Sequence, residues 1–450
     1  MNWLVGLLVN SPVIEMNMHD FIFARSSGFW NLQNRTGGTD YPTSSEIGHL
    51  VPALLTLQPC RLPNLPTPRR FHMKYCHKLT IATLLLGGIS PALISAAHAD
   101  QTVRIGVAGP LTGGQSNFGK DDERGVRLAI EELNRTPIVV DGQSIKFEML
   151  SEDDAADPKT GVSVAQKLVD SGVKAVIGHY NSGVTIPASR IYNNARVPMI
   201  TGAASNPAIT QQSFPYVFRL AANDNVMGAR MAEYAAKVLH AKRVAVIDDR
   251  TAYGSGVADV FAATAKKNGI DVVAREYSND KATDFNAILT HIKAQRPDAI
   301  FYGGYYAQAA AIGRQSKQLG LAVPVLGGDG ICSVDMPKLA AGTLNGRGYC
   351  AEGGAPLATL PGGPEFAARY EKQFGVKNDV YSPAFYSATM VVAQAMKAAN
   401  STDPEKFVPM LKQIQFSTLV GKVAFDKNGD WIDAPVTVYK VSGDNLSPTQ

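Results

Sequence analysis

The feature that most constrains the fold is a repeated alternation of strand and helix patterns along residues 100–450. Short β-branched runs predict strands at residues 103–107, 145–150, 175–177, 198–200, 244–247, 272–275, 299–302 and 323–326. Periodic apolar patterns predict helices at residues 120–134, 158–170, 185–194, 225–239, 256–268, 284–295 and 308–319. Such alternation is typical of mostly parallel sheets with helices on both faces.

The alternation runs in two series, and it restarts after residues 214–219. Two series of similar length predict an α/β protein with two doubly wound parallel-sheet lobes. The tail is more helical, with helices expected at residues 364–374, 383–400 and 404–413 and short strands near 423–425 and 436–441. We expect this tail to complete both lobes. The predicted first lobe is 100–221 plus about 353–432, and the second is 222–352 plus about 433–450.

The charge balance excludes a strongly basic or acidic partner. The chain has 43 Lys/Arg and 39 Asp/Glu, of which residues 1–99 hold seven and four, so residues 100–450 are almost neutral. No nucleic-acid partner is therefore expected. The hydrophobic content of 45% also excludes general disorder.

Residues 73–99 have the pattern of a secretory signal. Lys74 and Lys78 precede an apolar run over 79–94, and Ala97-His98-Ala99 supplies the small residues of a cleavage site. A membrane anchor is the alternative, but Gly, Ser and Pro interrupt the run. We expect translation to start at Met73, with residues 1–72 a start-site artefact or else a long unstructured leader. The mature protein then begins at Asp100 in the periplasm.

The cysteines agree with export. Only Cys332 and Cys350 follow the predicted cleavage site. Two cysteines in an oxidising compartment predict one disulfide, and two buried free thiols are the alternative.

No motif supports catalysis. Residues 114–121 nearly match a phosphate-binding P-loop, but Asp121 stands where Ser or Thr would bind Mg²⁺. The sequence has no Gly-x-Ser-x-Gly elbow and no His/Cys spacing suited to a metal. We therefore expect no enzyme activity, no cofactor and no metal, with an enzyme of unknown type as the alternative.

Polar residues follow two strands of the first series, where open α/β sheets bind ligands. Residues 178–183 and 201–207 lead into helices and include Ser182 and Ser205. Helix starts offer free N–H groups that suit a carboxylate. Helix capping by these serines, without any ligand, is the alternative.

The corresponding strand ends of the second series carry aromatic residues and one acid. Tyr253 and Tyr305 follow two of these strands, and Asp329 lies in a Gly-rich turn after a third. Core packing and turn formation are the alternatives. Facing lobes of this kind would complement a zwitterion with an apolar side chain.

On these residues the chain resembles the periplasmic branched-chain amino-acid-binding proteins (leucine/isoleucine/valine-binding) of ABC importers, which have the type I periplasmic-binding-protein fold. The resemblance covers residues 100–450, and its motifs lie at residues 105–113, 153–158, 176–179, 253–256 and 301–305. It implies two lobes joined by a three-crossover hinge, which close over the ligand. It also implies a monomer that docks in its closed form on the membrane permease.

Residue roles follow from the same resemblance. It implies that Ser182, Ala204 and Ser205 hold the ligand carboxylate, and that the Ala203 carbonyl, the Ser205 hydroxyl and Asp329 hold the ammonium. Six further residues would line or close the pocket, namely Phe118, Tyr180, Tyr253, Tyr305, Gly330 and Tyr381. The resemblance leaves open other amino acids, small amides, aromatic acids or a ligand-sensing module.

The chain departs from the family pattern in three ways. Asp329 stands where relatives often have Glu, and Ser205 replaces a Thr. Ala156 and Asn181 occupy the positions of a cysteine pair that some relatives have in the first lobe, so Cys332 and Cys350 must form a different bridge.

Overall fold

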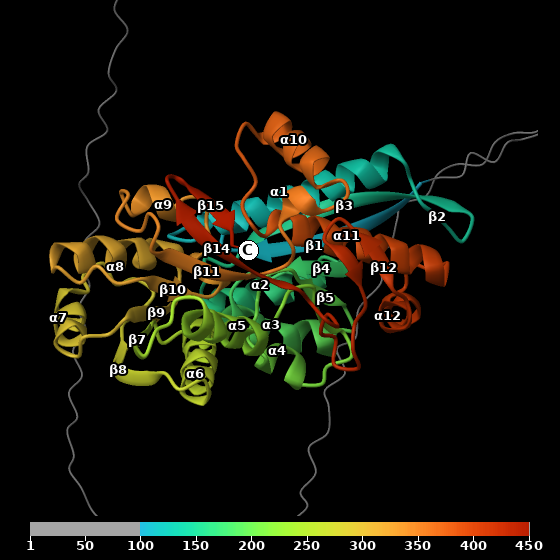
Figure 1. Ribbon diagram of the computed structural model, residues 1–450. Coiled ribbons are helices and arrows are strands. Elements are labelled where there is room, and N and C mark those ends of the chain that lie inside the picture. Colours follow the sequence, from blue (N-terminus) through green and yellow to red (C-terminus); the bar gives the residue numbers. More distant parts are fainter. Residues whose placement is uncertain (1–99, 450) are drawn as a thin grey trace, which may run out of the picture. The chain divides into compact units, whose positions relative to one another are not determined.

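Two separate β-sheets organise residues 100–449, which are the residues that the computed structural model describes (Figure 1). The first sheet has six strands in the order β2-β3-β1-β4-β5-β6. All neighbours are parallel except β2 and β3. Its strands are β1 (Gln101–Gly109), β2 (Val139–Val140), β3 (Gln143–Asp153), β4 (Ala175–Gly178), β5 (Met199–Thr201) and β6 (Val217–Arg219).

Helices cover both faces of the first sheet. In β4, Ala175 and Ile177 belong to one apolar cluster, whereas Val176 between them belongs to another. This alternation is what a strand buried on both faces requires. The helices of this part are α1 (Ser116–Arg135), α2 (Pro158–Asp170), α3 (Ser182–Asn194) and α4 (Ala208–Gln211).

The second sheet has seven strands in the order β15-β14-β11-β10-β9-β7-β8. The five strands from β11 to β8 are parallel, and β14 and β15 add an antiparallel edge. The strands are β7 (Arg243–Asp248), β8 (Asp271–Tyr277), β9 (Ala299–Gly303), β10 (Val325–Gly327), β11 (Gly348–Gly353), β14 (Val436–Ser442) and β15 (Asn445–Pro448). Its helices are α5 (Asp224–Lys237), α6 (Ala252–Lys267), α7 (Asn286–Ala294), α8 (Tyr306–Gln318) and α9 (Met336–Leu339).

The C-terminal tail contributes to both sheets, as the orange and red segments of Figure 1 show. Helix α11 (Ser382–Ala399) packs on α1, and α12 (Pro404–Gln413) packs on α11. Helix α10 (Gly363–Phe374) contacts α1, and the hairpin of β12 (Phe416–Thr418) and β13 (Gly421–Val423) contacts α11. Strands β14 and β15 instead extend the second sheet.

We define the first lobe as the first sheet with α1–α4 and α10–α12, and the second lobe as the second sheet with α5–α9. The chain then passes between the lobes three times: between β6 and α5, after β11, and before β14. We propose the predicted lobe boundaries near residues 221, 353 and 432 on this basis.

The predicted fold class is confirmed by the two parallel-dominated sheets. Strand β11, the antiparallel strands β2 and β15, and the short strand β6 were not predicted. The sequence of β11, Gly-Tyr-Cys-Ala-Glu-Gly, has no β-branched residue, so its strand character comes from pairing with β10 and β14. The predicted strand at 423–425 is shifted by two residues from β13, which ends at Val423.

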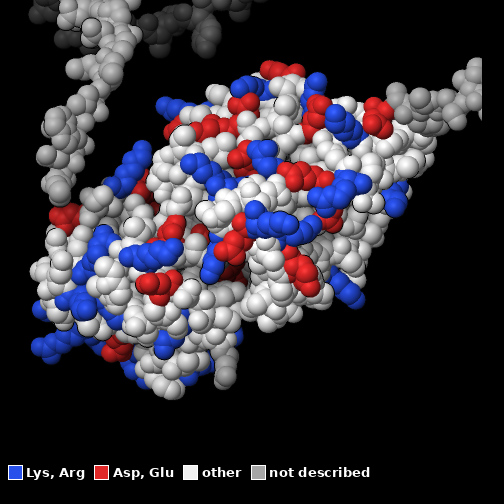
Figure 2. Space-filling view, turned by 90° about the horizontal axis from the view of Figure 1, so that it is seen from above, with Lys and Arg blue, Asp and Glu red and all other residues white. Residues whose placement is uncertain are grey.

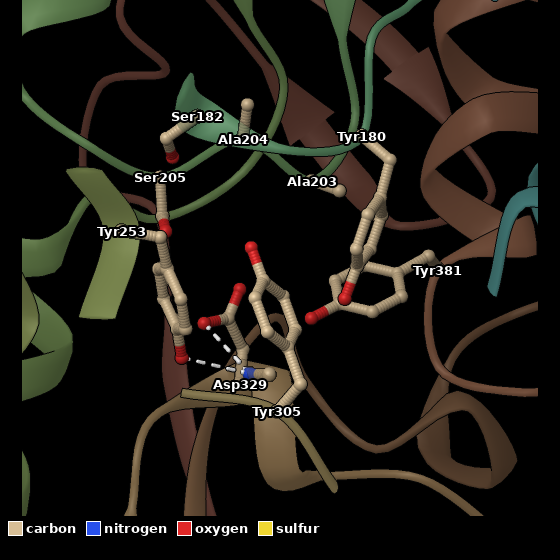
Figure 3. A pocket seen from close by; sticks show the side chains of 10 residues that line it. Tyr180, Ser182, Ala203, Ala204, Ser205, Tyr253, Tyr305, Asp329 and Tyr381 are labelled. Carbon is tan, nitrogen blue, oxygen red and sulfur yellow. Dashed lines mark hydrogen bonds between the residues drawn. The ribbon is translucent and has the colours of Figure 1, made fainter. Parts of the chain in front are cut away.

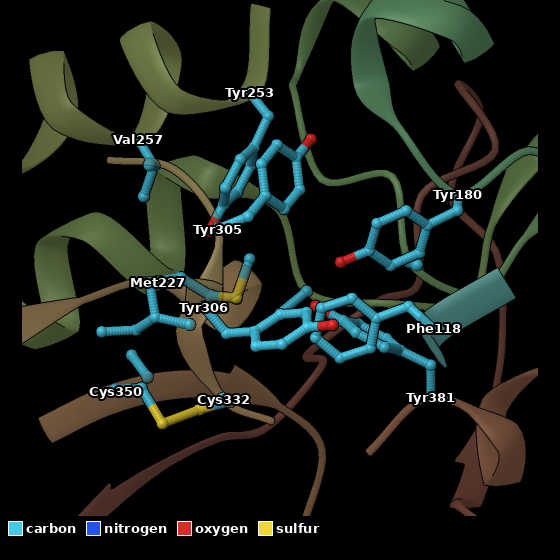
Figure 4. Packing of buried hydrophobic residues seen from close by; sticks show 14 of the residues in the cluster. Phe118, Tyr180, Met227, Tyr253, Val257, Tyr305, Tyr306, Cys332, Cys350 and Tyr381 are labelled. Carbon is cyan, nitrogen blue, oxygen red and sulfur yellow. A yellow bond between two sulfur atoms is a disulfide. The ribbon is translucent and has the colours of Figure 1, made fainter. Parts of the chain in front are cut away.

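The predicted disulfide is confirmed. Cys332 and Cys350 are bonded, with their Cα atoms 5.5 Å apart. The bridge ties the segment after β10 to β11, and it lies in the same buried cluster as the aromatic residues Phe118, Tyr306 and Tyr381 (Figure 4). The alternative of two free thiols is therefore wrong.

The surface seen in Figure 2 carries basic and acidic side chains interspersed, in keeping with the nearly neutral charge of residues 100–450. Within the described part of the chain, no helix is both long enough and apolar enough to cross a membrane. The predicted secretory signal at residues 73–99 and the predicted artefact at 1–72 lie outside the described residues.

Candidate functional site

A small cavity lies where the two lobes face each other, at the carboxyl ends of their parallel strands (Figure 3). Its first-lobe lining follows β4 and β5 or precedes α11, and its second-lobe lining comes from α6 and the segments after β9 and β10. We call it the cleft cavity, and its lining residues are Tyr180, Ser182, Ala203, Ala204, Ser205, Tyr253, Tyr305, Asp329, Gly330 and Tyr381.

The first lobe presents hydroxyl and backbone groups to this cavity. Ser182 is the first residue of α3, so its N–H is one of the groups that no helical carbonyl can reach. Its hydroxyl accepts a hydrogen bond from Asn206 N at 3.2 Å. The Ala204 N–H already donates to Thr201 Oγ1 at 2.9 Å. No backbone hydrogen bond within the described residues occupies the N–H of Ser205. Its hydroxyl lies beside the carboxyl of Asp224 and lowers the pKa of that group.

Capping does not account for the two serines. The residue that precedes α3 is Asn181, and the residue that precedes α4 is Pro207. Neither helix start receives a hydrogen bond from a serine side chain. The alternative that Ser182 and Ser205 serve only as helix caps is therefore wrong.

The second lobe presents one carboxylate. Asp329 is only 4% exposed and begins the short helix η1 (Asp329–Ile331) directly after β10. Its Oδ1 accepts the Gly330 N–H at 3.1 Å, and the same N–H donates to the Tyr253 hydroxyl at 2.8 Å. Burial raises the pKa of Asp329 to about 6, and the hydroxyls of Tyr253 and Tyr381 partly offset this effect. A buried carboxylate of this kind gains from a cation placed beside it.

Glycine at position 330 is required by this packing. A Cβ atom there would lie 2.7 Å from the Gly304 carbonyl oxygen and 2.7 Å from the Tyr253 ring. Any side chain would therefore displace the ring that lies beside Asp329.

Four tyrosines enclose the rest of the cavity. The ring centroid of Tyr180 lies 5.2 Å from that of Tyr381, and the centroid of Tyr305 lies 5.4 Å from that of Tyr253. In Figure 3 the hydroxyls of Tyr180, Tyr305 and Tyr381 point toward the space between the lobes. The cavity volume is about 10 Å³, close to what one water molecule needs. The lobes must therefore part before a larger molecule can enter.

Hydrogen bonds between the lobes hold this closed arrangement. Asn181 Nδ2 of the first lobe donates to the Tyr305 hydroxyl of the second at 2.8 Å, and also to Gln115 Oε1 at 2.5 Å. Asn206 Nδ2 donates to the Ala252 carbonyl at 2.6 Å. The Asn181–Tyr305 and Asn206–Ala252 bonds join the two lobes and break when the lobes separate, whereas the Asn181–Gln115 bond lies within the first lobe.

One buried acid beside the site was not predicted. Asp224 begins α5, and both of its carboxyl oxygens are buried and accept no hydrogen bond of normal geometry from the residues that the structure describes. Burial raises its pKa to about 8, with a further contribution from the nearby charge of Asp329. The only sequence signal was an acid in the first turn of a helix, which the helix dipole favours in any protein.

Phe118 is the one predicted site residue that does not line the cavity. It is fully buried in α1 and stacks on Tyr180, with ring centroids 5.1 Å apart. It also contacts Tyr306 and Tyr381 edge-on at 5.0 and 5.2 Å. Phe118 therefore supports the tyrosines from behind.

The P-loop-like segment has a structural role. Asp121 accepts hydrogen bonds from the Tyr370 hydroxyl, Asp379 N and Ser382 N, at 2.8, 2.9 and 2.8 Å. This ties α1 to the start of α11. Among residues 100–449 no group of His, Cys, Asp and Glu is arranged to hold a metal.

Comparisons with known proteins agree with this geometry. A family model described as periplasmic binding protein matches residues 102–445. An amino acid binding protein of Pseudomonas aeruginosa is 33% identical over 364 residues, which cover 81% of this chain and 96% of the relative. A relative from the same organism, a leucine-, isoleucine-, valine-, threonine-, and alanine-binding protein, is 34% identical over 353 residues, with coverages of 77% and 91%.

A solved structure of a leucine-binding protein is also similar to this chain. The leucine-binding protein LivK of Thermotoga maritima matches with a TM-score of 0.72 at 30% sequence identity. The match covers 77% of this chain and 98% of that one.

Proposed function

Since the chain belongs to the periplasmic binding protein family, we propose that it is the extracytoplasmic solute-binding protein of an ABC importer. In this proposal it captures a branched-chain amino acid (leucine, isoleucine or valine) in the cleft cavity. The closed form then delivers the ligand to the membrane permease. The protein acts as a monomer in the periplasm after its signal is removed, and it is not an enzyme.

The observation that carries this proposal is the chemical difference between the two walls of the cleft cavity. Ser182 and Ser205 offer hydroxyl and N–H donors from the first lobe, and Asp329 offers a carboxylate from the second. An α-amino acid has a carboxylate at one end and an ammonium at the other. It therefore satisfies both walls at once, which a simple acid or amine cannot do.

Burial of the ligand makes this arrangement selective. Enclosing an unpaired charge in a dry site is unfavourable, so each charged end of the ligand needs a partner in a fixed place. The ligand joins the two lobes, and its stronger binding to the closed form shifts the protein toward closure. A dissociation constant of about 1 μM would correspond to roughly −8 kcal/mol.

A second candidate is an amino acid with a smaller or more polar side chain. The cleft cavity has a volume of about 10 Å³, and the hydroxyls of Tyr180, Tyr305 and Tyr381 face it (Figure 3). Alanine or threonine would need less displacement of these rings than leucine. The relative that is 34% identical is named for binding all five of these amino acids.

Calorimetric titration of the purified exported protein tests the proposal. Leucine, isoleucine and valine should bind at one site, and alanine and threonine in the same experiment decide between the two candidates. Bound leucine should resist displacement by 4-methylpentanoate, which lacks the ammonium, and by 3-methylbutylamine, which lacks the carboxylate. The proposal fails if no amino acid binds, or if one of these half-ligands competes as well as leucine does.

A further inference from the structure

A second and larger cavity lies at the three crossovers between the lobes. Its volume is about 210 Å³, against about 10 Å³ for the cleft cavity. Leu220 of the first crossover, Gly354 and Ala355 of the second, and Trp431 just before the third all line it. We call it the hinge cavity. Nothing in the proposed capture of an amino acid uses it.

Strand β11 carries a carboxylate into this cavity. β10 pairs with β11 only as far as Cys350, so Glu352 lies two residues beyond the last parallel pairing. In the antiparallel ladder Glu352 stands opposite Thr437, and Tyr439 stands opposite Cys350. Side chains two residues apart share a face of the sheet, so Glu352 and Tyr439 lie on the same face, and both line the hinge cavity.

Among residues 100–449, no group forms a hydrogen bond with the buried Oε2 atom of Glu352. The residue as a whole is 8% exposed. Burial raises the pKa of Glu352 well above its usual range, and the charge of Asp379 adds to the effect. A buried acceptor without a donor is unfavourable, so a cationic donor that enters the cavity satisfies this oxygen and favours the ionised form of Glu352.

The neighbouring acid, Asp379, is in the opposite situation. Its Oδ2 accepts the Ser333 hydroxyl at 2.8 Å, and its Oδ1 accepts Val334 N at 3.2 Å and Val380 N at 3.0 Å. Asp379 therefore needs no ligand. Among the acids that line the hinge cavity, Glu352 is the one buried carboxylate with an unused oxygen.

The rest of the lining indicates the chemical class of the ligand. The acids Glu352, Asp379 and Asp444 line the cavity, and no Lys, Arg or His of the described part of the chain does. The remaining wall is largely apolar, and includes Leu220, Leu357, Leu360, Trp431 and Leu446. One free carboxylate oxygen in an apolar surround is too few ligands for a metal ion, which takes several oxygens. It matches an organic cation with one charged end and an apolar body.

We propose that the hinge cavity is a second binding site, separate from the cleft cavity, that takes a small alkylammonium compound with its ammonium on Glu352. The apolar body of such a compound would lie against the leucines and Trp431. This site does not depend on which ligand the cleft cavity takes.

The test uses n-butylammonium as the probe, with 1-butanol and butyrate as uncharged and anionic controls. Binding is followed by calorimetry on the whole exported protein, with the cleft cavity saturated by its amino acid ligand. Butylammonium should bind with 1:1 stoichiometry. Butanol should bind at least tenfold more weakly, and butyrate should not bind. Equal binding of butanol, or no binding of butylammonium, would overturn the proposal.

Variants assign the site. Glu352→Gln keeps the shape and should weaken butylammonium binding at least tenfold. The matched control Glu365→Gln removes an exposed acid of α10 and should change nothing. Asp329→Asn should also bind butylammonium, since Asp329 does not line the hinge cavity and both Glu352 and the apolar wall remain. Leu446→Trp places a larger side chain in the hinge cavity and leaves Glu352 unsubstituted, and it should block binding even if Glu352→Gln folds poorly. Loss of binding in Asp329→Asn would place the amine in the cleft and overturn the proposal.

Discussion

The two walls of the cleft cavity have the same architecture and opposite chemistry. Both lie at the carboxyl ends of parallel strands, in segments that lead into a helix. The first lobe places Ser182 and Ser205 there, and the second places Asp329. The strands fix where a ligand can bind, and the residues after each strand decide which charge that wall accepts.

The walls also differ in how much burial disturbs them. Ser182 and Ser205 are neutral, so burying them is less unfavourable than burying a charged group. Asp329 is charged when ionised, and burial raises its pKa to about 6. A ligand ammonium therefore offsets a larger burial cost at Asp329 than the ligand carboxylate offsets at the two serines. Mutations in the two walls should weaken binding by unequal amounts.

Removing the carboxylate of the second wall should have the largest effect. We expect Asp329→Ala to weaken leucine binding by roughly 30- to 5,000-fold, because losing one partner of a desolvated charge pair costs about 2–5 kcal/mol. Calorimetric titration with leucine, isoleucine and valine measures the change. The unliganded fold should stay intact, as a thermal melt would show.

The companion variant Asp329→Asn separates charge from shape. It keeps the size of the side chain and loses the negative charge, so it should bind only slightly better than Asp329→Ala. Wild-type affinity in Asp329→Ala would mean that the ammonium is held elsewhere, for instance by the buried Asp224, or that the ligand is not an amino acid.

Removing a donor of the first wall should have a smaller effect. We expect Ser205→Ala to weaken leucine binding by about 10- to 100-fold, because a hydrogen bond to a charged group contributes about 1.5–3 kcal/mol. The backbone N–H of the residue remains, so part of the wall survives. Ser213→Ala changes a serine in the segment between α4 and β6 and serves as the control. A loss as large as that of Asp329→Ala would contradict the ranking of the two walls.

Most of the fold could be predicted from local patterns. Helix α2 was predicted with its observed bounds because Asp157 caps it and Pro158 opens it, which are signals carried by adjacent residues. Strand β11 could not be predicted in this way. Its residues have little strand preference, and its position depends on β10 and β14, from distant parts of the chain.

In the site, too, features set by adjacent residues could be predicted and features set by distant parts of the chain could not. Strand ends followed by serine or aspartate are local signals, and they led to residues that lie around one cavity. Phe118 lies behind that cavity, because whether an aromatic ring lines a cavity or supports its wall depends on its tertiary neighbours. The place of Asp224 beside Ser205 and the bond from Asn181 to Tyr305 arise only once the two lobes face each other.

The pH dependence of binding sharpens the contrast between a neutral wall and a charged one. Only ionised Asp329 attracts an ammonium, and its pKa is about 6. At pH 5 about a tenth of this carboxyl is ionised, so leucine should bind up to about tenfold more weakly there than at pH 7. Asp329→Asn should lose most of this dependence. Titrations between pH 5 and pH 8 measure both, and a flat profile in the wild type would contradict the assignment.

The free energy of unfolding of the unliganded protein should depend on pH in the opposite sense to leucine binding, so that low pH favours the fold and weakens binding. The pKa of Asp329 is about 6 when folded, above its usual value, so the folded state binds more protons between about pH 4 and pH 6. Its contribution to stability is present below pH 4 and is lost as the pH rises through 6. Asp224, with a pKa of about 8, acts in the same sense at higher pH. Urea unfolding of the wild type and of Asp329→Asn at each pH therefore isolates the contribution of Asp329, which is the difference between the two free energies of unfolding.

The smallest effect should come from a residue that joins the two walls and offers nothing charged to the ligand. Asn181 Nδ2 donates to the Tyr305 hydroxyl across the cleft, and this bond forms only when the lobes are closed. We expect Asn181→Ala to weaken leucine binding by about two- to tenfold, since a neutral hydrogen bond contributes about 0.5–1.5 kcal/mol. The loss should appear as faster dissociation in stopped-flow measurements, because the bond holds the closed form. Asn345→Ala is the matched control, because Asn345 accepts only Gly443 N within the second lobe. Unchanged dissociation in Asn181→Ala would mean that the ligand alone holds the lobes together.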